Sequence, residues 1–211
     1  MLYVIIRAIA VVLYKILFRL EAYGRENIPR QGGFILASNH ASHIDPPLLA
    51  AASPRKVAFI AKEELFDHPF AAWFLRGLNA FPVKLKAADI KSMRESIRRL
   101  KIGEALAIFP EGRRSENGEL DKPLGGIGLI AARSGVPIVP AYIEGSIKAL
   151  PRGTACVRPI KIRVYFGKPF RIDELKSTAE RRREHYYAIA ALTMRKIAQI
   201  KEGLQTQATK K

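Results

Sequence analysis

The chain has almost none of the residues that build disulfides or structural metal sites. Its 211 residues include a single cysteine, Cys156, which excludes an internal disulfide and a cysteine metal cluster and fits a reducing compartment. The four histidines are scattered along the sequence, at His40, His43, His68 and His185, and form no zinc-binding pattern. We therefore expect no metal and no other resident cofactor.

Acidic residues are also scarce. Aspartate and glutamate number 19 against 36 lysines and arginines, which gives a formal net charge of +17 and an isoelectric point near 10.2. A basic surface predicts an anionic partner: nucleic acid, anionic lipid headgroups, a phosphorylated substrate or an acidic carrier protein. The aromatic residues Phe70, Trp73 and Phe74 stand among apolar neighbours, which does not favour binding of single-stranded nucleic acid. The charge thus predicts the sign of the partner and not its identity.

No apolar run approaches the roughly 20 residues that a membrane-spanning helix needs. The first 20 residues are apolar but are interrupted by Arg7, Lys15 and Arg19, which fall within one arc of roughly 120° on a helix. This pattern predicts a helix over residues 1–22 that lies in the membrane interface, with its basic side chains reaching the headgroups. A signal peptide fits less well, because no basic residue precedes the apolar stretch. A plain core helix is the remaining alternative.

The rest of the chain alternates between strand-like and helix-like segments. This alternation predicts one α/β domain over residues 23–204, with a central mixed sheet flanked by helices, and a polar, disordered tail over residues 205–211. Asp45 followed by Pro46 is typical of a helix start, with Asp45 as the N-cap. We expect strands over residues 33–39, 57–61, 80–83, 105–109, 137–144 and 160–167, and further helices over residues 67–76, 89–100, 127–133 and 179–202.

The loop after the first of these strands carries a histidine and a carboxylate five residues apart. His40 is a suitable base near neutral pH, and Asp45 could hold its other ring nitrogen and stabilise the imidazolium. The spacing alone is weak evidence, and His43 could also be the base.

Two later segments complete the candidate site. In the loop FPEGRRS, a turn at Gly112 followed by Arg113 and Arg114 suits a phosphate group, although a solvated basic turn is an equal alternative. The segment VPIVP (residues 136–140) predicts a buried strand, and its two prolines indicate an edge strand or a bulge.

Taken together, NHASHID, AFPVK, FPEGRRS and GVPIVPAYIEG, in this order, resemble the four motifs of the glycerophospholipid acyltransferases. Within this family the motifs resemble those of the bacterial 1-acyl-sn-glycerol-3-phosphate acyltransferases, and the resemblance extends over about residues 23 to 170. It implies that His40 deprotonates the acceptor hydroxyl, that Asp45 orients His40, and that His43 is a bystander. It implies an acceptor phosphate region of Lys84, Lys86, Glu111, Gly112, Arg113 and Arg114, and an acyl-donor region of Val136, Pro137, Ile138, Val139 and Pro140.

The resemblance also implies an activity and a setting. The chain would transfer a fatty-acyl group from acyl-CoA or acyl carrier protein to the free hydroxyl of 1-acyl-sn-glycerol 3-phosphate and so form phosphatidic acid. It would act at an anionic membrane surface, on the cytoplasmic face of a bacterial inner membrane, with no nucleic-acid partner. Glycerol 3-phosphate, another lysophospholipid or a lyso-aminolipid are alternative acceptors. Lys84 and Lys86 stand where the family commonly carries an arginine, and Arg113 where threonine is usual, so acceptor choice is open. The absence of a G-x-S-x-G motif argues for direct transfer, without an acyl-enzyme.

Overall fold

The structure, a computed structural model, describes residues 2–83, 90–154, 156–172 and 182–209. Lys84 and Lys86, which the sequence assigned to the acceptor site, lie outside the described residues.

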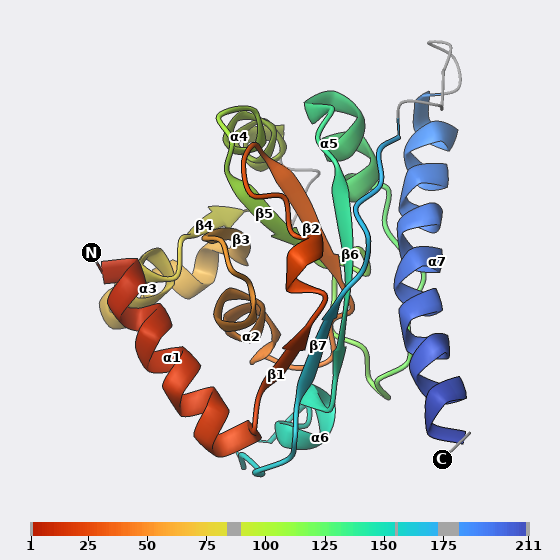
Figure 1. Cartoon of the computed structure of the whole chain (residues 1–211). Helices are drawn as coiled ribbons and strands as arrows, with labels where there is room; N and C mark the ends of the chain where they lie inside the picture. Colours follow the sequence, from red (N-terminus) through yellow and green to blue (C-terminus); the bar gives the residue numbers. More distant parts are fainter. Residues whose placement is uncertain (1, 84–89, 155, 173–181, 210–211) are drawn as a thin grey trace.

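A seven-stranded sheet forms the centre of the molecule (Figure 1). Every neighbouring pair of strands is parallel except β6 and β7, so the sheet is mixed, as predicted. The strand order is β1-β7-β6-β2-β5-β3-β4. The strands are β1 (Glu21–Tyr23), β2 (Phe34–Ser38), β3 (Val57–Lys62), β4 (Ala80–Val83), β5 (Ala105–Ile108), β6 (Ile138–Glu144) and β7 (Arg163–Phe166).

Helices cover both faces of this sheet (Figure 1). They are α1 (Leu2–Phe18), α2 (Asp45–Ala52), α3 (Pro69–Gly77), α4 (Ile90–Lys101), α5 (Gly126–Ser134), α6 (Ser146–Ala149) and α7 (Arg182–Thr209), with 3-10 turns η1 (Arg25–Asn27) and η2 (Glu63–Phe66). On one face, α1 packs against α2, and on the other α7 packs against α5 and β6. The single α/β domain predicted from the alternating segments is therefore confirmed.

Two hydrophobic cores lie on opposite sides of the sheet. Successive residues of a strand point to opposite faces, so Leu36 enters the core beneath α1 and α2, whereas Ile35 enters the core beneath α5 and α7. Both side chains are fully buried, as the central position of β2 requires. The sheet is thus a rigid support for the loops at the carboxyl ends of its central strands.

The two prolines of residues 136–140 do not mark an edge strand, as the sequence had indicated, because β6 lies between β2 and β7. Pro140 occupies the gap between the ladder that joins Ala141 to Phe166 and the isolated bridge between Ile138 and Phe170. A residue without an N–H group is tolerated where pairing is interrupted. The pairing with β7 is therefore interrupted at Pro140, and the edge alternative was wrong.

Helix α7 continues through Thr209, so residues 205–209 are helical and the prediction of a disordered tail over residues 205–211 was wrong for them. Thr206 Oγ1 donates a hydrogen bond to the carbonyl of Glu202 in this last part of the helix. Extending a helix that is already docked costs far less than starting one, which favours helix even in a polar sequence.

Of the three basic residues of the N-terminal segment, Arg7 is oriented differently from the prediction, whereas Lys15 and Arg19 are exposed. Arg7 donates to the carbonyl oxygens of Ala50, at 2.9 Å, and Ser53, at 2.6 Å, and so points into the protein rather than toward lipid headgroups. The physical reason is that the carbonyls at the end of α2 lack intrahelical partners, and a guanidinium satisfies them. Phe18, at the end of α1, is buried in the core, and the predicted boundary between residues 22 and 23 falls inside β1.

Candidate active site

The site is built at the carboxyl ends of β2 and β5, which are neighbouring parallel strands. His40 follows β2 after one further residue, and Phe109 follows β5 directly. Asn39 holds the start of the His40 loop, because its side-chain oxygen accepts from the N–H of Ile143 and its amide donates to the carbonyl of the same residue. The loop is therefore tied to β6 as well.

His40 and Asp45 meet directly. Nδ1 of His40 lies 2.9 Å from Oδ2 of Asp45, whose side chain is fully buried. The same oxygen accepts the backbone N–H groups of Ala41 and Ser42, each at 2.7 Å. Backbone N–H groups can only donate, so Oδ2 of Asp45 acts as an acceptor in this turn. The proton in its contact with His40 is then carried by Nδ1, and Nε2 is left to accept a proton.

This geometry replaces the predicted role of Asp45 as the helix N-cap. Asp45 is the first residue of α2, Ile44 occupies the cap position, and no side-chain cap bond forms. The carboxylate turns back instead to the loop that precedes it. Pro46 does lie in the first turn, where its missing N–H costs no hydrogen bond.

His43 lies beside the pair and does not share Asp45. Its side chain is largely exposed. Partial desolvation of the ring lowers its pKa, the charges of Arg114 and His40 act in the same direction, and that of Asp45 opposes the shift. Both Arg114 and His40 therefore lie within electrostatic reach of His43. The carboxylate selects His40 as the oriented imidazole, which the residues alone had left open between the two histidines.

The two arginines of the turn after β5 differ in their pairing. Arg113 forms an ion pair with Asp121 at 3.2 Å, and both side chains are well exposed. Arg114 is half-buried and makes no hydrogen bond or ion pair with another described residue. A guanidinium without such a partner among the described residues is suited to an anionic substrate group.

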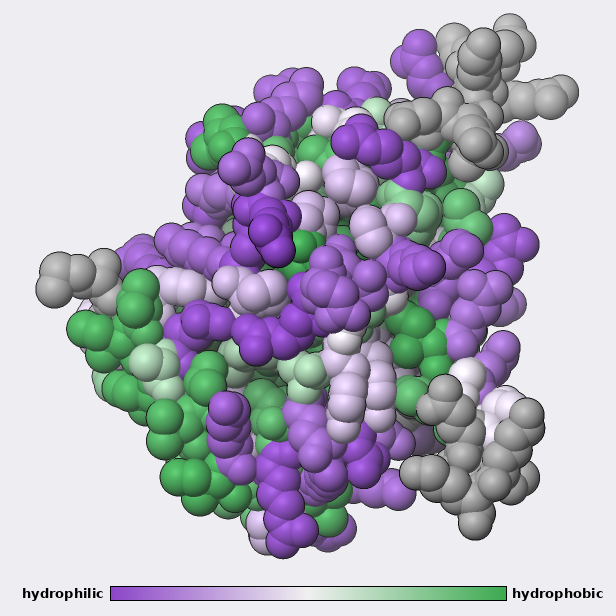
Figure 2. All heavy atoms as spheres, viewed as in Figure 1, coloured by the Kyte–Doolittle hydropathy of each residue, from purple (hydrophilic) through white to green (hydrophobic). Residues whose placement is uncertain are grey.

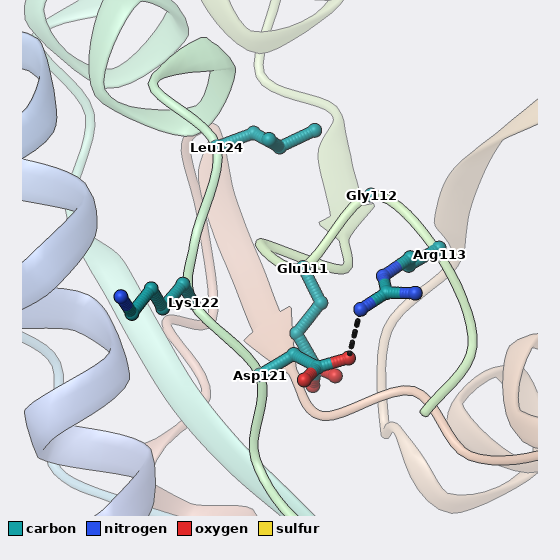
Figure 3. Close-up of a pocket in the computed structure, with 6 residues that line it drawn as sticks. All are labelled: Glu111, Gly112, Arg113, Asp121, Lys122 and Leu124. Atoms are coloured by element: carbon teal, nitrogen blue, oxygen red, sulfur yellow. Dashed lines mark ion pairs between the residues drawn. The ribbon is translucent and has the colours of Figure 1, made fainter. Parts of the chain in front are cut away.

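Glu111, Gly112 and Arg113 line a hollow of about 390 Å³ together with Asp121, Lys122 and Leu124 (Figure 3). Gly112 has φ 68°, a left-handed conformation that glycine adopts readily. The Glu111 side chain is buried, and burial raises its pKa to about 7, while hydrogen bonds from the N–H groups of His40 and Asp121 oppose the shift. Figure 3 shows its carboxyl group directed toward Asp121.

The residues predicted for the acyl-donor region do not lie on this surface. Ile138, Val139 and Pro140 are buried inside the sheet, and Val136 and Pro137 lead into β6. Their assignment to the acyl donor stays a prediction, since the described contacts give Ile138 and Val139 a core role. Within the described residues, no group of three metal-binding side chains is placed to hold an ion.

Sequence reasoning missed two contributors to the site. Phe109 stacks on the His40 ring, with centroids 4.0 Å apart and planes inclined by 20°. Ser42 fixes the far side of the loop by donating to the carbonyl of Leu150, at 2.8 Å. The position of Phe109 directly after a buried strand was the available signal, but its use requires knowing that β5 lies beside β2.

Comparisons with known proteins identify the family of the chain. The family model described as Acyltransferase matches residues 19–144. The 1-acyl-sn-glycerol-3-phosphate acyltransferase of Bacillus subtilis is 32% identical over 152 residues, which cover 71% of this chain and 73% of that protein. A chloroplastic enzyme of the same name from Brassica napus is 31% identical over 158 residues, 72% of this chain and 45% of the relative.

A solved structure extends the likeness to the fold. The crystal structure of the 1-acyl-sn-glycerophosphate acyltransferase PlsC from Thermotoga maritima superposes with a TM-score of 0.76 at 31% sequence identity. The match covers 94% of this chain and 79% of that one. The matched region of the family model contains His40, Asp45 and the whole turn after β5. The chain belongs to the acyltransferase family.

Proposed function

We propose that the chain transfers a fatty-acyl group from an acyl thioester to the free hydroxyl of 1-acyl-sn-glycerol 3-phosphate and so forms phosphatidic acid. The observation that carries this proposal is the contact of 2.9 Å between His40 Nδ1 and Asp45 Oδ2, on the loop next to the turn that carries Arg114, which has no ion-pair partner in the part of the chain that the structure describes. The names of the relatives from Bacillus subtilis and Brassica napus support the choice of acceptor.

In the proposed reaction, Nε2 of His40 takes the proton of the acceptor hydroxyl as its oxygen attacks the thioester carbonyl. The C–S bond then breaks, and the thiolate leaves with the proton held by His40. Asp45 stabilises the imidazolium that forms in between. A thioester is already activated, so a positioned base and the alignment of the two substrates are sufficient help. No resident cofactor takes part, and acyl-CoA or acyl carrier protein is the co-substrate.

Arg114 is proposed to bind the acceptor phosphate. A guanidinium offers two parallel N–H groups to phosphate oxygens, and no described neighbour competes for those of Arg114. Glycerol 3-phosphate and another lysophospholipid satisfy the same contact, whereas a lyso-aminolipid without a phosphate does not.

The test is a matrix of thioester donors and hydroxyl acceptors, assayed with the purified full chain in detergent. Acyl-CoA and acyl carrier protein thioesters are each offered with 1-acyl-sn-glycerol 3-phosphate, glycerol 3-phosphate and an unphosphorylated monoacylglycerol. We expect turnover to be greatest with 1-acyl-sn-glycerol 3-phosphate and to depend on His40. Equal turnover of the unphosphorylated acceptor would exclude the phosphate contact, and no turnover of any acceptor would exclude the function.

We further propose that the chain binds a membrane surface through α1 and α3. Their exposed apolar side chains include Ile16, at 76% exposure, and Phe70, at 69%, and the two helices are in contact. Figure 2 shows a continuous hydrophobic area over the part of the molecule where α1 lies. We call this the apolar surface; it comprises Val4, Ile5, Ile9, Val12, Leu13, Ile16, Leu65, Phe70, Trp73 and Phe74.

An exposed apolar area of this extent marks an interaction site. No helix among the described residues is long and apolar enough to cross a bilayer. Peripheral attachment therefore uses these side chains, and the net charge of +17 favours anionic lipid. We propose that the surface to which the chain attaches is the cytoplasmic face of a bacterial inner membrane.

Point substitutions test this better than removal of α1, since removal would also take Phe18, the last residue of α1, out of the hydrophobic core. We expect Ile16→Glu to weaken sedimentation with phosphatidylglycerol vesicles. Ile102→Glu is the matched control: it changes the same residue type at a position beyond α4 that is 61% exposed, and it should leave sedimentation unchanged. Equal effects of the two substitutions would contradict the assignment of the surface, and salt-sensitive retention on DNA instead would favour a nucleic-acid partner.

A further inference from the structure

Three contacts join His40 to the turn of residues 109–115. The Phe109 ring is stacked on the imidazole, with centroids 4.0 Å apart. Oε1 of Glu111 accepts a hydrogen bond from the backbone N–H of His40, at 3.2 Å. The N–H of Ser115 donates to the carbonyl of His40, at 2.7 Å. The turn therefore contacts the ring of His40 and both polar groups of its backbone.

These contacts remove motions that Asp45 cannot remove. A single hydrogen bond at Nδ1 fixes one edge of the imidazole, but the ring can still tilt about that bond. A flat aromatic ring against one face of the imidazole restricts the tilt, and nearly parallel rings in contact are a favourable arrangement. The direction of Nε2, which must meet the substrate hydroxyl, then follows from Asp45 and Phe109 together.

The Glu111 carboxyl group is placed for a supporting role and not for contact with a phosphate. The residue is only 3% exposed, and Oε2 is buried without a hydrogen-bond partner among the described residues. A carboxylate would also repel a phosphate at close range. Its contact with the N–H of His40 instead fixes the backbone from which the imidazole projects.

We propose that this turn positions the catalytic base, with Phe109 setting the plane of the His40 ring and Glu111 fixing the His40 backbone. Glu111 thus acts on turnover and not on acceptor affinity, in contrast to the role that the family resemblance implies for it. The proposal rests on the proposed function of His40 as the base. Phe109 and Glu111 are positioning residues, because both act through His40.

Steady-state kinetics separate positioning from acceptor binding. Phe109→Leu removes the aromatic face and should lower kcat by about three- to tenfold, with the acceptor KM unchanged, whereas Phe109→Tyr keeps the ring and should keep kcat. Glu111→Ala should lower kcat, and Glu111→Gln, which retains an oxygen acceptor, should restore it. A raised acceptor KM with normal kcat in both Glu111 variants would overturn the proposal for Glu111.

Phe170→Leu is the matched control for the loss of an aromatic ring. Phe170 packs against the core on the opposite face of the sheet and makes no ring contact with a described residue. The kcat of the Phe170→Leu variant should stay at the wild-type value. A thermal unfolding curve of each variant ensures that kcat refers to folded protein.

A second measurement is independent of turnover. In full-length protein labelled with ¹⁵N-histidine, the His40 signals are assigned by their loss in His40→Gln. We expect the Nδ1–H tautomer, and ring protons displaced by the Phe109 ring current in the wild type and in Phe109→Tyr but not in Phe109→Leu. Identical His40 spectra in the wild type and Phe109→Leu would overturn the positioning role. Normal spectra in a chain without acyl transfer would instead refute the proposed function alone.

Discussion

Asp45 holds His40 through an oxygen that it also shares with the two backbone N–H groups that follow His40 in the loop. The contact of 2.9 Å between Nδ1 and Oδ2 is thus part of a small closed turn, in which Ala41 and Ser42 donate to the same atom. Because Asp45 also begins α2, the carboxylate is fixed by the helix on one side and by the loop on the other. The orientation of the imidazole is therefore set before any substrate binds.

Removing either member of this pair should abolish most turnover. We expect His40→Ala to lower kcat by about three orders of magnitude, because general base catalysis contributes on that scale, and Asp45→Asn to lower it through loss of the correct tautomer. His43→Ala is the matched control and should retain most of kcat, since Asp45 does not contact His43. Binding to vesicles should be normal in all three. A His40→Ala variant that retains most of its turnover would remove His40 from the mechanism.

Arg114 should govern affinity for a phosphorylated acceptor. We expect Arg114→Ala to raise the acceptor KM by about 10- to 100-fold with little change in kcat, since the lost contact is a charged hydrogen bond made equally in ground and transition states. Arg113→Ala should have a smaller effect, because Asp121 already pairs with that side chain. An acceptor without a phosphate should show no difference between the variants. An unchanged KM for 1-acyl-sn-glycerol 3-phosphate in folded Arg114→Ala would contradict the assignment.

Arg7 should stabilise the docking of α1 on α2. Arg7→Ala leaves the carbonyls of Ala50 and Ser53 without their donors, and we expect a loss of about 1–3 kcal/mol in the free energy of unfolding. Arg30→Ala, at an exposed position, should cost much less. Chemical unfolding followed by the fluorescence of Trp73 measures both variants. If Arg7→Ala were as stable as the wild type, water would replace the guanidinium without a loss in the free energy of unfolding.

The sequence predicted the layers of the fold but not their connections. Alternating strands and helices predict an α/β domain, and the apolar run at residues 33–39 predicts a strand, which the structure shows as β2. The three residues of β1 are too few for a periodic pattern, and the place of that strand beside β7 depends on pairing between segments about 140 positions apart. A helical wheel likewise shows that Arg7 lies apart from the apolar face but not which side of α1 meets α2.

The candidate site could be predicted only in part, because its geometry also depends on which distant segments lie side by side. A spacing of five residues allows His40 and Asp45 to meet, but only the turn at Ala41 and Ser42 decides that His40, and not His43, receives the carboxylate. The stacking of Phe109 on His40 depends on the adjacency of β2 and β5, which no local pattern contains. The burial of Glu111 is a tertiary effect of the same kind, and it changes the expected chemistry of that side chain.

Glu111 should make the stability of the fold depend on pH in a defined direction. Burial, opposed by hydrogen bonds from His40 and Asp121, raises its pKa in the folded chain from the ordinary 4.5 to about 7, and the charges of Asp121 and Asp45 act in the same direction as burial. Between these two pH values the folded chain holds a proton that the unfolded chain has lost. The contribution of the neutral carboxyl group is therefore complete below about pH 4.5 and is lost as the pH rises through 7.

Glu111→Gln imitates the neutral form at every pH. We expect it to be more stable than the wild type by about 1–2 kcal/mol at pH 8, and no more stable at pH 4, because only the wild type must bury a charge at the higher pH. Thermal unfolding at a series of pH values measures the difference, and Glu64→Gln, at an exposed position, is the control that should show no such trend. A gain of the same size at both pH values would mean that the glutamine improves packing, and a loss at pH 8 would mean that the ionised carboxylate is the form that the N–H of His40 requires.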